Sequence, residues 1–373
     1  MSLPDAIPSF SSPMGLRRPT RRIQVGAVAV GNGAPITVQS MTKTDTADIE
    51  ATSGQIAELA ALGCDIIRLA VPDERAAGAL KTICERSPLP VVADIHFNHR
   101  LALMALDAGV AGLRINPGNI GGEDRVREVV RAAQGRKVPI RIGVNAGSLE
   151  KDLLARFGGA TAEALVESAL GHVHLLEAAG YQEIKISVKA SDVHRTVAAY
   201  RLLSQRTPYP LHLGLTEAGT FMAGTVRSSV ALGILLAEGI GDTIRVSLTD
   251  RPHEEIRVGL ELLRCLGLRS PGPQVTSCPT CGRIRIDVIR LARQVEEALE
   301  VFYRAHPGRS CPRVAVMGCM VNGPGEAREA DIAIAGGDGK AALYVKGRPV
   351  ATVPEDQVVA AILEQVERWG RVE

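Results

Sequence analysis

The stretch Ile140-Arg-Ile-Gly-Val-Asn145 alternates aliphatic and polar residues, and the same pattern returns in Glu183-Ile-Lys-Ile-Ser-Val-Lys189. Successive side chains of a strand point to opposite faces, so each stretch predicts a strand with one aliphatic and one polar face. A segment of helical length follows each of them. The same strand-and-helix unit recurs on both sides, with strands expected to begin at Ile36, Asp65, Val91 and Gly112 and to run from Leu211 to Glu217 and from Thr243 to Thr249.

Eight such units lie between Pro35 and Leu268. A run of about 230 residues with eight alternating strands and helices has the size of a closed (β/α)8 barrel. We therefore expect an α/β fold, a (β/α)8 TIM barrel followed by a smaller α+β domain. The expected divisions are a flexible N-terminal extension over residues 1–19, a substrate-binding barrel over 20–269 and a second domain over 274–373.

The polar faces of the expected strands carry an excess of basic residues. The aliphatic faces must meet the surrounding helices, so the polar faces line the lumen of the barrel. A buried ion-pair network is one interpretation, but unpaired buried charge is unfavourable and few acids are present to neutralise it. An anion, favoured as a phosphate or diphosphate, is the other. The residues expected at this binding mouth are Arg68, Asp94, His96, Arg114, Asn116, Arg141, Asn145, Lys185, Ser187, Lys189, His212, Arg245 and Ser247.

The repeat ends at the linker Leu268-Arg-Ser-Pro-Gly-Pro273. Hydrophobic periodicity beyond it predicts a helix, a strand, a hairpin and a closing amphipathic helix. These elements are expected near 284–304, 314–317, 332–353 and 355–369.

Two cysteine motifs lie in this second domain, Cys278-Pro-Thr-Cys281 and Cys319 in a glycine-rich segment. A pair two residues apart can hold one metal centre from a single turn, and a third thiolate from a distant loop can join it. Zinc is the alternative to an iron-sulfur centre, but a zinc ribbon needs a second knuckle, and no histidine lies near Cys319. The spacing favours iron-sulfur. Of the seven cysteines, three are expected to be inert core residues: Cys64, Cys84 and Cys265.

The composition argues against several classes of function. With 43 basic and 41 acidic residues the net charge is only +2, and aromatic residues make up 3% of the chain. Neither value indicates a nucleic-acid binder. No apolar signal segment follows the arginines between Arg17 and Arg22, and the longest apolar run, near Val230, is too short to span a bilayer. We expect a cytoplasmic protein without nucleic-acid or membrane partners.

A set of motifs in order along the chain carries a closer resemblance. These motifs are Val38-Gln-Ser-Met-Thr42, Ala93-Asp-Ile-His-Phe97, Leu113-Arg-Ile-Asn-Pro-Gly-Asn-Ile120, Arg141 to Asp152, Ser187 to Asp192, His212-Leu-Gly-Leu-Thr-Glu-Ala-Gly219, Cys278 to Cys281 and Gly318 to Glu326. In these motifs the chain resembles the bacterial 4-hydroxy-3-methylbut-2-enyl diphosphate synthases of the non-mevalonate isoprenoid pathway, in their two-domain form. The resemblance covers nearly everything from Arg18 onward.

This resemblance implies a 4Fe-4S cluster as cofactor, held by Cys278, Cys281, Cys319 and Glu326, with Cys311 as a spectator. It implies the reductive opening of 2-C-methyl-D-erythritol 2,4-cyclodiphosphate to (E)-4-hydroxy-3-methylbut-2-enyl diphosphate, with two electrons entering and water leaving. Glu217 is then the expected catalytic acid that protonates the leaving hydroxyl. Its structural alternative is an ion-pair partner for one of the lumen cations.

The resemblance also implies flavodoxin or ferredoxin as electron donor and a homodimer whose active site forms in trans. The last barrel helix ends at the amino-end face, opposite the mouth, so a short linker can hardly bring Cys278 around to the lumen of its own chain. Two rival functions stay open at this point. One is a zinc-ribbon binding module attached to a barrel, and the other is a pterin- or corrinoid-linked transferase.

Overall fold

The structure, a computed structural model, describes residues 16–116, 120–269, 272–306, 308–321 and 323–369. The chain divides into two compact units, Met1–Arg269 and Ser270–Glu373. Among the described residues, no helix combines the length and the apolar character that crossing a bilayer requires.

The first unit is a TIM barrel, as the sequence predicted. Its parallel sheet has the strand order β8-β7-β6-β5-β4-β3-β10-β9 and closes where Ile186 bridges Leu211. The strands are β3 (Thr37–Met41), β4 (Ile66–Ala70), β5 (Val91–Asp94), β6 (Gly112–Ile115), β7 (Ile140–Asn145), β8 (Ile184–Lys189), β9 (His212–Leu213) and β10 (Thr243–Ile244).

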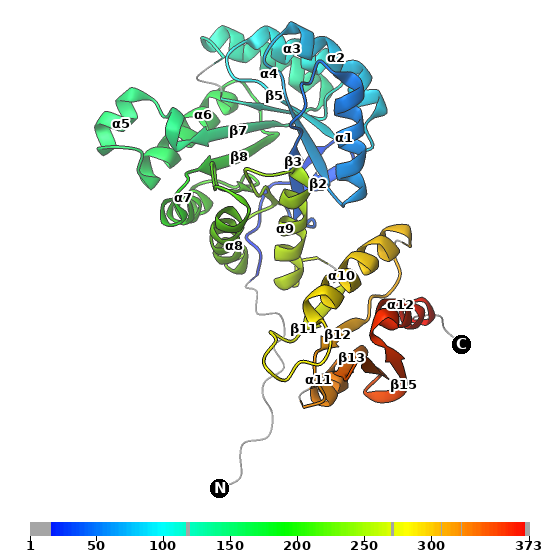
Figure 1. Cartoon of the computed structure of the whole chain (residues 1–373). Helices are drawn as coiled ribbons and strands as arrows, with labels where there is room; N and C mark the ends of the chain where they lie inside the picture. Colours follow the sequence, from blue (N-terminus) through cyan, green and yellow to red (C-terminus); the bar gives the residue numbers. More distant parts are fainter. Residues whose placement is uncertain (1–15, 117–119, 270–271, 307, 322, 370–373) are drawn as a thin grey trace. The chain divides into compact units, whose positions relative to one another are not determined.

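Helices surround these strands (Figure 1). They are α1 (Ile49–Ala61), α2 (Glu74–Arg86), α3 (His99–Asp107), α4 (Glu123–Arg136), α5 (Lys151–Phe157), α6 (Ala162–Ala178), α7 (Val193–Arg206), α8 (Phe221–Ala237) and α9 (Pro252–Cys265), with a short 3-10 turn, η2 (Ala146–Ser148), before α5. Two helices, α5 and α6, therefore occupy the single connection between β7 and β8.

Strand register explains which residues face the lumen. Arg114 on β6 pairs with Arg141 on β7, which in turn pairs with Lys185 on β8. Paired residues in a sheet point to the same face, so the three basic side chains enter the lumen together. The alternate residues, such as Ile140 and Ile184, are fully buried in the aliphatic layer between strands and helices.

The seventh and eighth barrel strands are shorter than predicted, because β9 and β10 have two residues each. The Arg245 N–H still donates to the Leu213 carbonyl of β9 at 3.0 Å, but beyond Arg245 the hydrogen bonds come from loops and side chains. The Leu248 N–H donates to the Glu255 carboxylate at 3.1 Å, and the Thr249 N–H donates to the Gly219 carbonyl at 2.9 Å. Alternation alone does not distinguish this extended loop from a strand.

A hairpin that the sequence did not indicate closes the amino end of the barrel. Strands β1 (Ile23–Val25) and β2 (Val28–Val30) pair antiparallel, and their aliphatic residues cluster with Ile66 and Val92. These two residues share the parity of Arg68 and Asp94 on β4 and β5, so they point into the lumen. The hairpin therefore plugs the barrel from below.

The expected N-terminal extension lies outside the described residues up to residue 15. Just beyond it, Arg17 contacts Asp242 at 3.2 Å, and the Arg18 guanidinium donates to the Tyr209 carbonyl at 2.7 Å. The described end of the extension is thus hydrogen bonded to the barrel.

The second unit is an α+β domain around one sheet. Its five strands are in sequence order, β11 (Gln274–Ser277), β12 (Arg313–Met317), β13 (Ile332–Gly337), β14 (Lys340–Val345) and β15 (Arg348–Pro354). The first three are parallel and the last two antiparallel. The helices are α10 (Val288–Ala305), α11 (Gly323–Glu329) and α12 (Val358–Arg368), with a 3-10 turn, η3 (Glu355–Gln357), before α12. The sequence predicted α10, β12 and α12 closely, gave one hairpin where two occur, and missed β11 and α11.

Candidate functional site

The lumen of the barrel gathers the basic side chains that the sequence pattern placed there. Arg114, Arg141, Lys185 and Lys189 are buried, and Arg68 and Arg245 are largely so. In the described part of the chain, the carboxylates in contact with them are those of Asp94 and Glu255. Cations exceed anions in this space, so the lumen carries a net positive charge.

Arg114 is fixed by several partners. Its guanidinium donates to Asp94 Oδ1 at 3.0 Å and to the Gly143 carbonyl at 3.1 Å, and it lies 2.8 Å from His96 Nε2. A Cβ atom on Gly143 would lie only 2.4 Å from Arg114 Nε, so the guanidinium occupies the space that a side chain would fill. Glycine at this position of β7 is what admits Arg114.

Asp94 is the acid at the centre of this group. Burial by itself would raise the pKa of its carboxyl, but Arg68, His96 and Arg114 outweigh burial and hold that pKa well below its usual range. Asp94 is therefore ionised and serves to orient its neighbours. His96 contacts the same carboxylate at 3.5 Å but is half exposed, at the rim of the mouth.

Arg141 keeps donors available. Its Nη1 donates to Ser187 Oγ at 2.8 Å, whereas Nε and Nη2 are buried and have no hydrogen-bond partner among the described residues. Arginine stays charged in proteins, so these buried donors await an acceptor. Burial, followed by the neighbouring Arg141, lowers the pKa of Lys185 to about 7, and burial with Arg141 and Arg245 lowers that of Lys189.

Such pKa shifts are the signature of like charges confined at low dielectric. A bound anion would reverse them and would supply acceptors for the donors of Arg141. The geometry therefore supports an anion in the lumen better than it supports an internally balanced ion-pair network.

Arg68 and Arg245 have looser partners. Arg68 Nε lies 3.6 Å from Asp94 Oδ2, and burial lowers the pKa of its guanidinium to about 10. Arg245 Nη2 lies 3.5 Å from Glu255 Oε2, and its Nε has no partner within the described ranges.

Sequence reasoning missed Glu255. It lies in the first turn of α9, where an acidic residue is ordinarily explained by the helix dipole. The signal that could have identified it is the buried face of α9, since Glu255 aligns with Ile256, Gly259 and Leu263 among the buried positions of that helix.

The remaining expected residues lie around the same space in different ways. His212 is fully buried, its Nδ1 lies 2.7 Å from Thr243 Oγ1, and burial with the nearby Lys189 lowers its pKa, so the ring is neutral. Asn116 is buried at the end of β6, whereas Asn145 at the end of β7 and Ser247 in the loop after β10 are half-buried. Glu217 is exposed beyond β9 with φ of 52°, a left-handed conformation that is unusual for a residue other than glycine and that recurs at functional sites.

The expected metal ligands of the second unit share one edge of its sheet. β11 and β12 are parallel, and each is followed directly by a cysteine motif. The Gly318 N–H donates to Cys278 Sγ at 3.3 Å, and the loop after Cys281 returns to the same point, where the Arg285 N–H donates to the Gly318 carbonyl at 2.9 Å. Gly318 has no room for a side chain, because its Cβ would lie 2.5 Å from Val288 Cγ2.

Glu326 belongs to α11, a helix that begins near this edge. The first residue of that helix, Gly323, is packed so closely on β13 that a Cβ there would lie 2.6 Å from Ala335 Cβ. Ala335 pairs with Met317, the last residue of β12, so α11 begins beside the end of that strand. Glu326 stands in its first turn and is exposed.

The residues at this edge are chemically suited to bind a metal centre, but they do not form a closed coordination sphere. Hydrogen bonds from the Arg283 backbone N–H and side chain lower the pKa of the Cys281 thiol, which favours the thiolate needed for ligation. Over the ranges that the structure describes, however, no three His, Cys, Asp or Glu side chains are gathered closely enough to hold a metal ion. Three soft thiolates and one harder carboxylate fit an iron-sulfur cluster with one exchangeable position.

The other cysteines lie elsewhere. Cys311 precedes β12, whereas Cys319 follows it, so they lie at opposite ends of a five-residue strand that is about 13 Å long at the usual rise per residue. Burial raises the pKa of Cys64 to about 12 and that of Cys84 to about 11, consistent with inert thiols. Cys265 is exposed, which contradicts the expectation that it belongs to the core.

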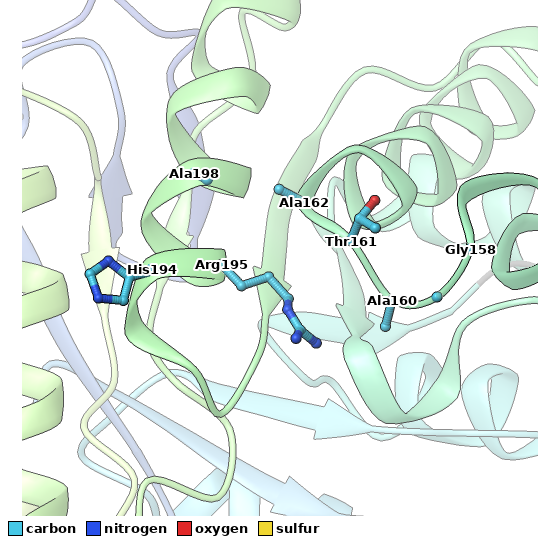
Figure 2. Close-up of a pocket in the computed structure, with 8 residues that line it drawn as sticks. Gly158, Ala160, Thr161, Ala162, His194, Arg195 and Ala198 are labelled. Atoms are coloured by element: carbon cyan, nitrogen blue, oxygen red, sulfur yellow. The ribbon is translucent and has the colours of Figure 1, made fainter.

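A surface pocket of about 480 Å³ lies away from these residues. The connection between α5 and α6 and the start of α7 form it, and Arg195 points toward Ala160 while His194 points the other way (Figure 2). None of the expected site residues lines it. Its lining is glycine, alanine, the half-buried Thr161 and the exposed His194 and Arg195, which provide no convergent set of buried polar groups.

Comparisons with known proteins cover both units. The model of the GcpE TIM-barrel domain matches residues 20–260, and that of the GcpE protein C-terminal domain matches residues 274–368. A protein of Geobacter sulfurreducens is 59% identical over 95% of this chain and 98% of its own length. One of Lawsonia intracellularis is 56% identical over 95% of this chain and 98% of its own length. Both are named 4-hydroxy-3-methylbut-2-en-1-yl diphosphate synthase (flavodoxin).

Solved structures match the barrel more distantly. The dihydropteroate synthase of Yersinia pestis has a TM-score of 0.48 and 13% identity over 66% of this chain and 97% of its own. At that distance, function does not follow from fold.

Proposed function

The chain belongs to the GcpE family, and we propose that it reduces 2-C-methyl-D-erythritol 2,4-cyclodiphosphate to (E)-4-hydroxy-3-methylbut-2-enyl diphosphate. Two electrons enter, the cyclic diphosphate opens and one water leaves. The observation that carries this proposal is the lumen, where the buried donors of Arg141 have no acceptor among the described residues and cations outnumber acids. A cyclic diphosphate brings the charge and the oxygen atoms that such a lumen lacks.

The barrel residues bind and orient the substrate in this proposal. Arg141 donates two free N–H groups to a phosphate, and Arg68, Arg114 and Lys189 contribute charge from neighbouring strands. Their burial strengthens each contact, because few waters compete at low dielectric. Hydroxyl and amide groups on the strands and in the loops that follow them orient the methylerythritol part: those of Asn116, Asn145, Ser187 and Ser247.

Glu217 is the proposed acid. It protonates the hydroxyl that leaves as water, and its exposed position lets it take up a new proton from solvent afterwards. The left-handed backbone at Glu217 fixes the direction of the side chain without a strand around it.

A 4Fe-4S cluster is the proposed cofactor, held by Cys278, Cys281, Cys319 and Glu326. When bound, it supplies single electrons, which no side chain can provide. Flavodoxin, which the names of the relatives contain, is the proposed electron donor, with ferredoxin as the alternative.

We also propose a homodimer in which each site combines the barrel of one chain with the cluster edge of the other. Arg269, the last residue of the barrel unit, pairs bidentately with Asp65 at 2.8 and 2.9 Å. Asp65 immediately precedes β4, at the amino end of the barrel, whereas the lumen opens at the carboxyl ends. The linker therefore starts from the face opposite the mouth, which favours assembly in trans.

Anaerobic purification with iron and sulfide analysis tests the cofactor, and turnover of the cyclic diphosphate with reduced flavodoxin tests the reaction. About four irons per chain are expected. Stoichiometric zinc without acid-labile sulfide would refute the cluster. Glu217→Gln should bind substrate normally and lose most turnover, and unchanged turnover would remove Glu217 from the mechanism.

The assembly has its own test. An Arg141→Ala chain mixed with a Cys319→Ser chain should regain activity, because one site of the heterodimer then pairs an intact barrel with an intact cluster edge. Full activity from a demonstrated monomer, or no recovery in verified heterodimers, would refute the site in trans.

A further inference from the structure

Glu255 is a buried carboxylate that the reaction proposed above does not use. Its side chain is 2% exposed, although it belongs to the first turn of the outer helix α9. Four groups contact its two oxygens. Ser40 Oγ donates to Oε2 at 3.1 Å and the Leu248 N–H donates to Oε1 at 3.1 Å. The other two are the cations Lys43 and Arg245.

Each of these cations contacts a different oxygen of the Glu255 carboxylate. Lys43 Nζ lies 3.6 Å from Oε1, and Arg245 Nη2 lies 3.5 Å from Oε2. Lys43 also donates to the Leu248 carbonyl at 3.1 Å and to the Asp250 carbonyl, so it ties the loop after β3 to the loop after β10. Both loops belong to the mouth, because they follow the carboxyl ends of adjacent strands.

Sharing of the Glu255 carboxylate between Lys43 and Arg245 affects the net positive charge that an anion meets at the mouth. A buried carboxylate with a single cationic neighbour pairs fully with it, because an unpaired charge at low dielectric is unfavourable. If Arg245 were the one cation beside Glu255, it would be drawn to that carboxylate and its charge would be cancelled. With Lys43 at 3.6 Å from the other oxygen, the carboxylate is shared between two cations. Arg245 contacts it through Nη2 at 3.5 Å, and its Nε has no partner in the described ranges.

We propose that Lys43 is a positioning residue for the anion site, and that it acts through Glu255 by engaging one carboxylate oxygen so that Arg245 stays available to the anion. Lys43 itself is more than one-third exposed and directs its ammonium group to backbone carbonyls and to Glu255. The inference rests on the proposed function in one respect, that the ligand is a diphosphate.

A double-mutant cycle on the full chain tests this inference, with inorganic diphosphate as the probe in titration calorimetry. Lys43→Met should weaken binding about tenfold, the usual scale for losing one charged contact. Glu255→Gln keeps an acceptor for the Leu248 N–H and should bind at least as tightly as the wild type. The double variant should return to within about threefold of the wild type, because without the carboxylate Lys43 has nothing to neutralise.

Three outcomes would overturn the inference. A Lys43→Met penalty that persists in the Glu255→Gln background would mean that Lys43 touches the anion directly. Unchanged binding in Lys43→Met would remove the residue from the site. A double variant that binds worse than either single one and melts at lower temperature would indicate a structural role. The matched control is Lys81→Met on the exposed face of α2, which should change nothing.

Steady-state kinetics gives a second readout. Lys43→Met should raise KM and leave kcat and iron content unchanged, a split that general destabilisation does not produce. Failure of the proposed function is distinguishable, because in that case the wild type itself would not bind diphosphate and Arg141→Ala would have no effect on the titration.

Discussion

The two units of the chain prepare their sites in opposite ways. In the barrel lumen, Arg114 is held by Asp94 and Gly143 on strands and by His96 just beyond β5, and its guanidinium occupies space that Gly143 leaves free. Arg141 is held by Ser187 on β8. In the second unit, the thiols and Glu326 stand on loops and a short helix at one sheet edge, partly or fully exposed, and are not gathered into a coordination sphere in the described residues.

The two sites obtain their stability from different sources. The lumen is preorganised by contacts that the folded barrel makes anyway, so the anion enters a nearly finished site. The sheet edge carries thiols and a carboxylate on loops and a short helix, so under the proposed function the binding free energy of the cluster would order these loops. A substitution in the barrel lumen should therefore change the affinity for the anion, and a substitution at the sheet edge of the second unit should change the cofactor content.

The largest effect is expected at the cysteines. Replacing Cys278, Cys281 or Cys319 by Ser should abolish cluster iron and turnover, because each removes one of few thiolate ligands. Diphosphate binding should persist, since the barrel keeps its own contacts. Iron and sulfide per chain after anaerobic reconstitution measure the effect. Cys311→Ser is the matched control at the other end of β12, and loss of the cluster in that variant would show a misassigned ligand.

A methyl group added in the lumen should weaken anion binding without changing the iron content. Gly143→Ala places a Cβ 2.4 Å from Arg114 Nε, so the guanidinium must move off its partners. We expect diphosphate affinity to fall tenfold or more, the scale of one or two lost charged hydrogen bonds, with iron content unchanged. Calorimetric titration measures the affinity. Gly135→Ala in α4, where a Cβ meets nothing within 4 Å, is the control and should bind normally. Normal binding in Gly143→Ala would mean that Arg114 does not contact the anion.

Removal of iron should change the thermal stability of the second unit alone. Chelation should lower the melting temperature of the second unit, whose ligand loops lose their cross-link, and leave the barrel transition in place. Differential scanning calorimetry of the holo and iron-free chain resolves the two transitions. A single transition that moves as a whole would show that the units unfold together and that the division of stability is wrong.

The smallest effect concerns pH. Burial lowers the pKa of Lys185 to about 7 from its usual 10.5, so between these values the unfolded chain binds the extra proton. Stability then increases with pH from about 7 to about 10.5 and does not change with Lys185 below that window. Lys185→Met should melt higher than the wild type at pH 7, by a few degrees, and the gap should shrink toward pH 10. A gap that does not depend on pH would mean that Lys185 is not buried as a cation.

The sequence predicted the barrel well because parity is a local signal. Arg114, Arg141 and Lys185 alternate with aliphatic residues, and a period of two fixes their common face before any contact is known. The same signal overestimated the length of the eighth strand, because β10 has two residues, and Ser247 lies in the loop beyond Arg245, whose N–H still donates to Leu213 of β9. Local alternation does not record whether a neighbouring backbone is present to pair with.

Other parts of the site could not be obtained from pattern at all. Glu255 reaches the mouth from a helix, and its partners Ser40 and Lys43 lie more than two hundred residues earlier. The plug strand β1 has three residues, too few for periodicity to stand out, and its partners Ile66 and Val92 are distant in sequence. Contacts of this kind depend on how the closed barrel brings distant segments together. The sequence pattern implies the closed barrel but does not indicate which distant residues meet.

The plug has a kinetic consequence. Ile23, Val25 and Val30 seal the amino end against Ile66 and Val92, so the lumen is a well with one opening. Substrate and product both carry a diphosphate in the proposed reaction, and both must pass through the mouth of the barrel. A product molecule that has not yet departed therefore blocks the next arrival, and inhibition by product should be competitive with respect to substrate. Turnover at high product concentration is then governed by the rate at which product dissociates from the lumen.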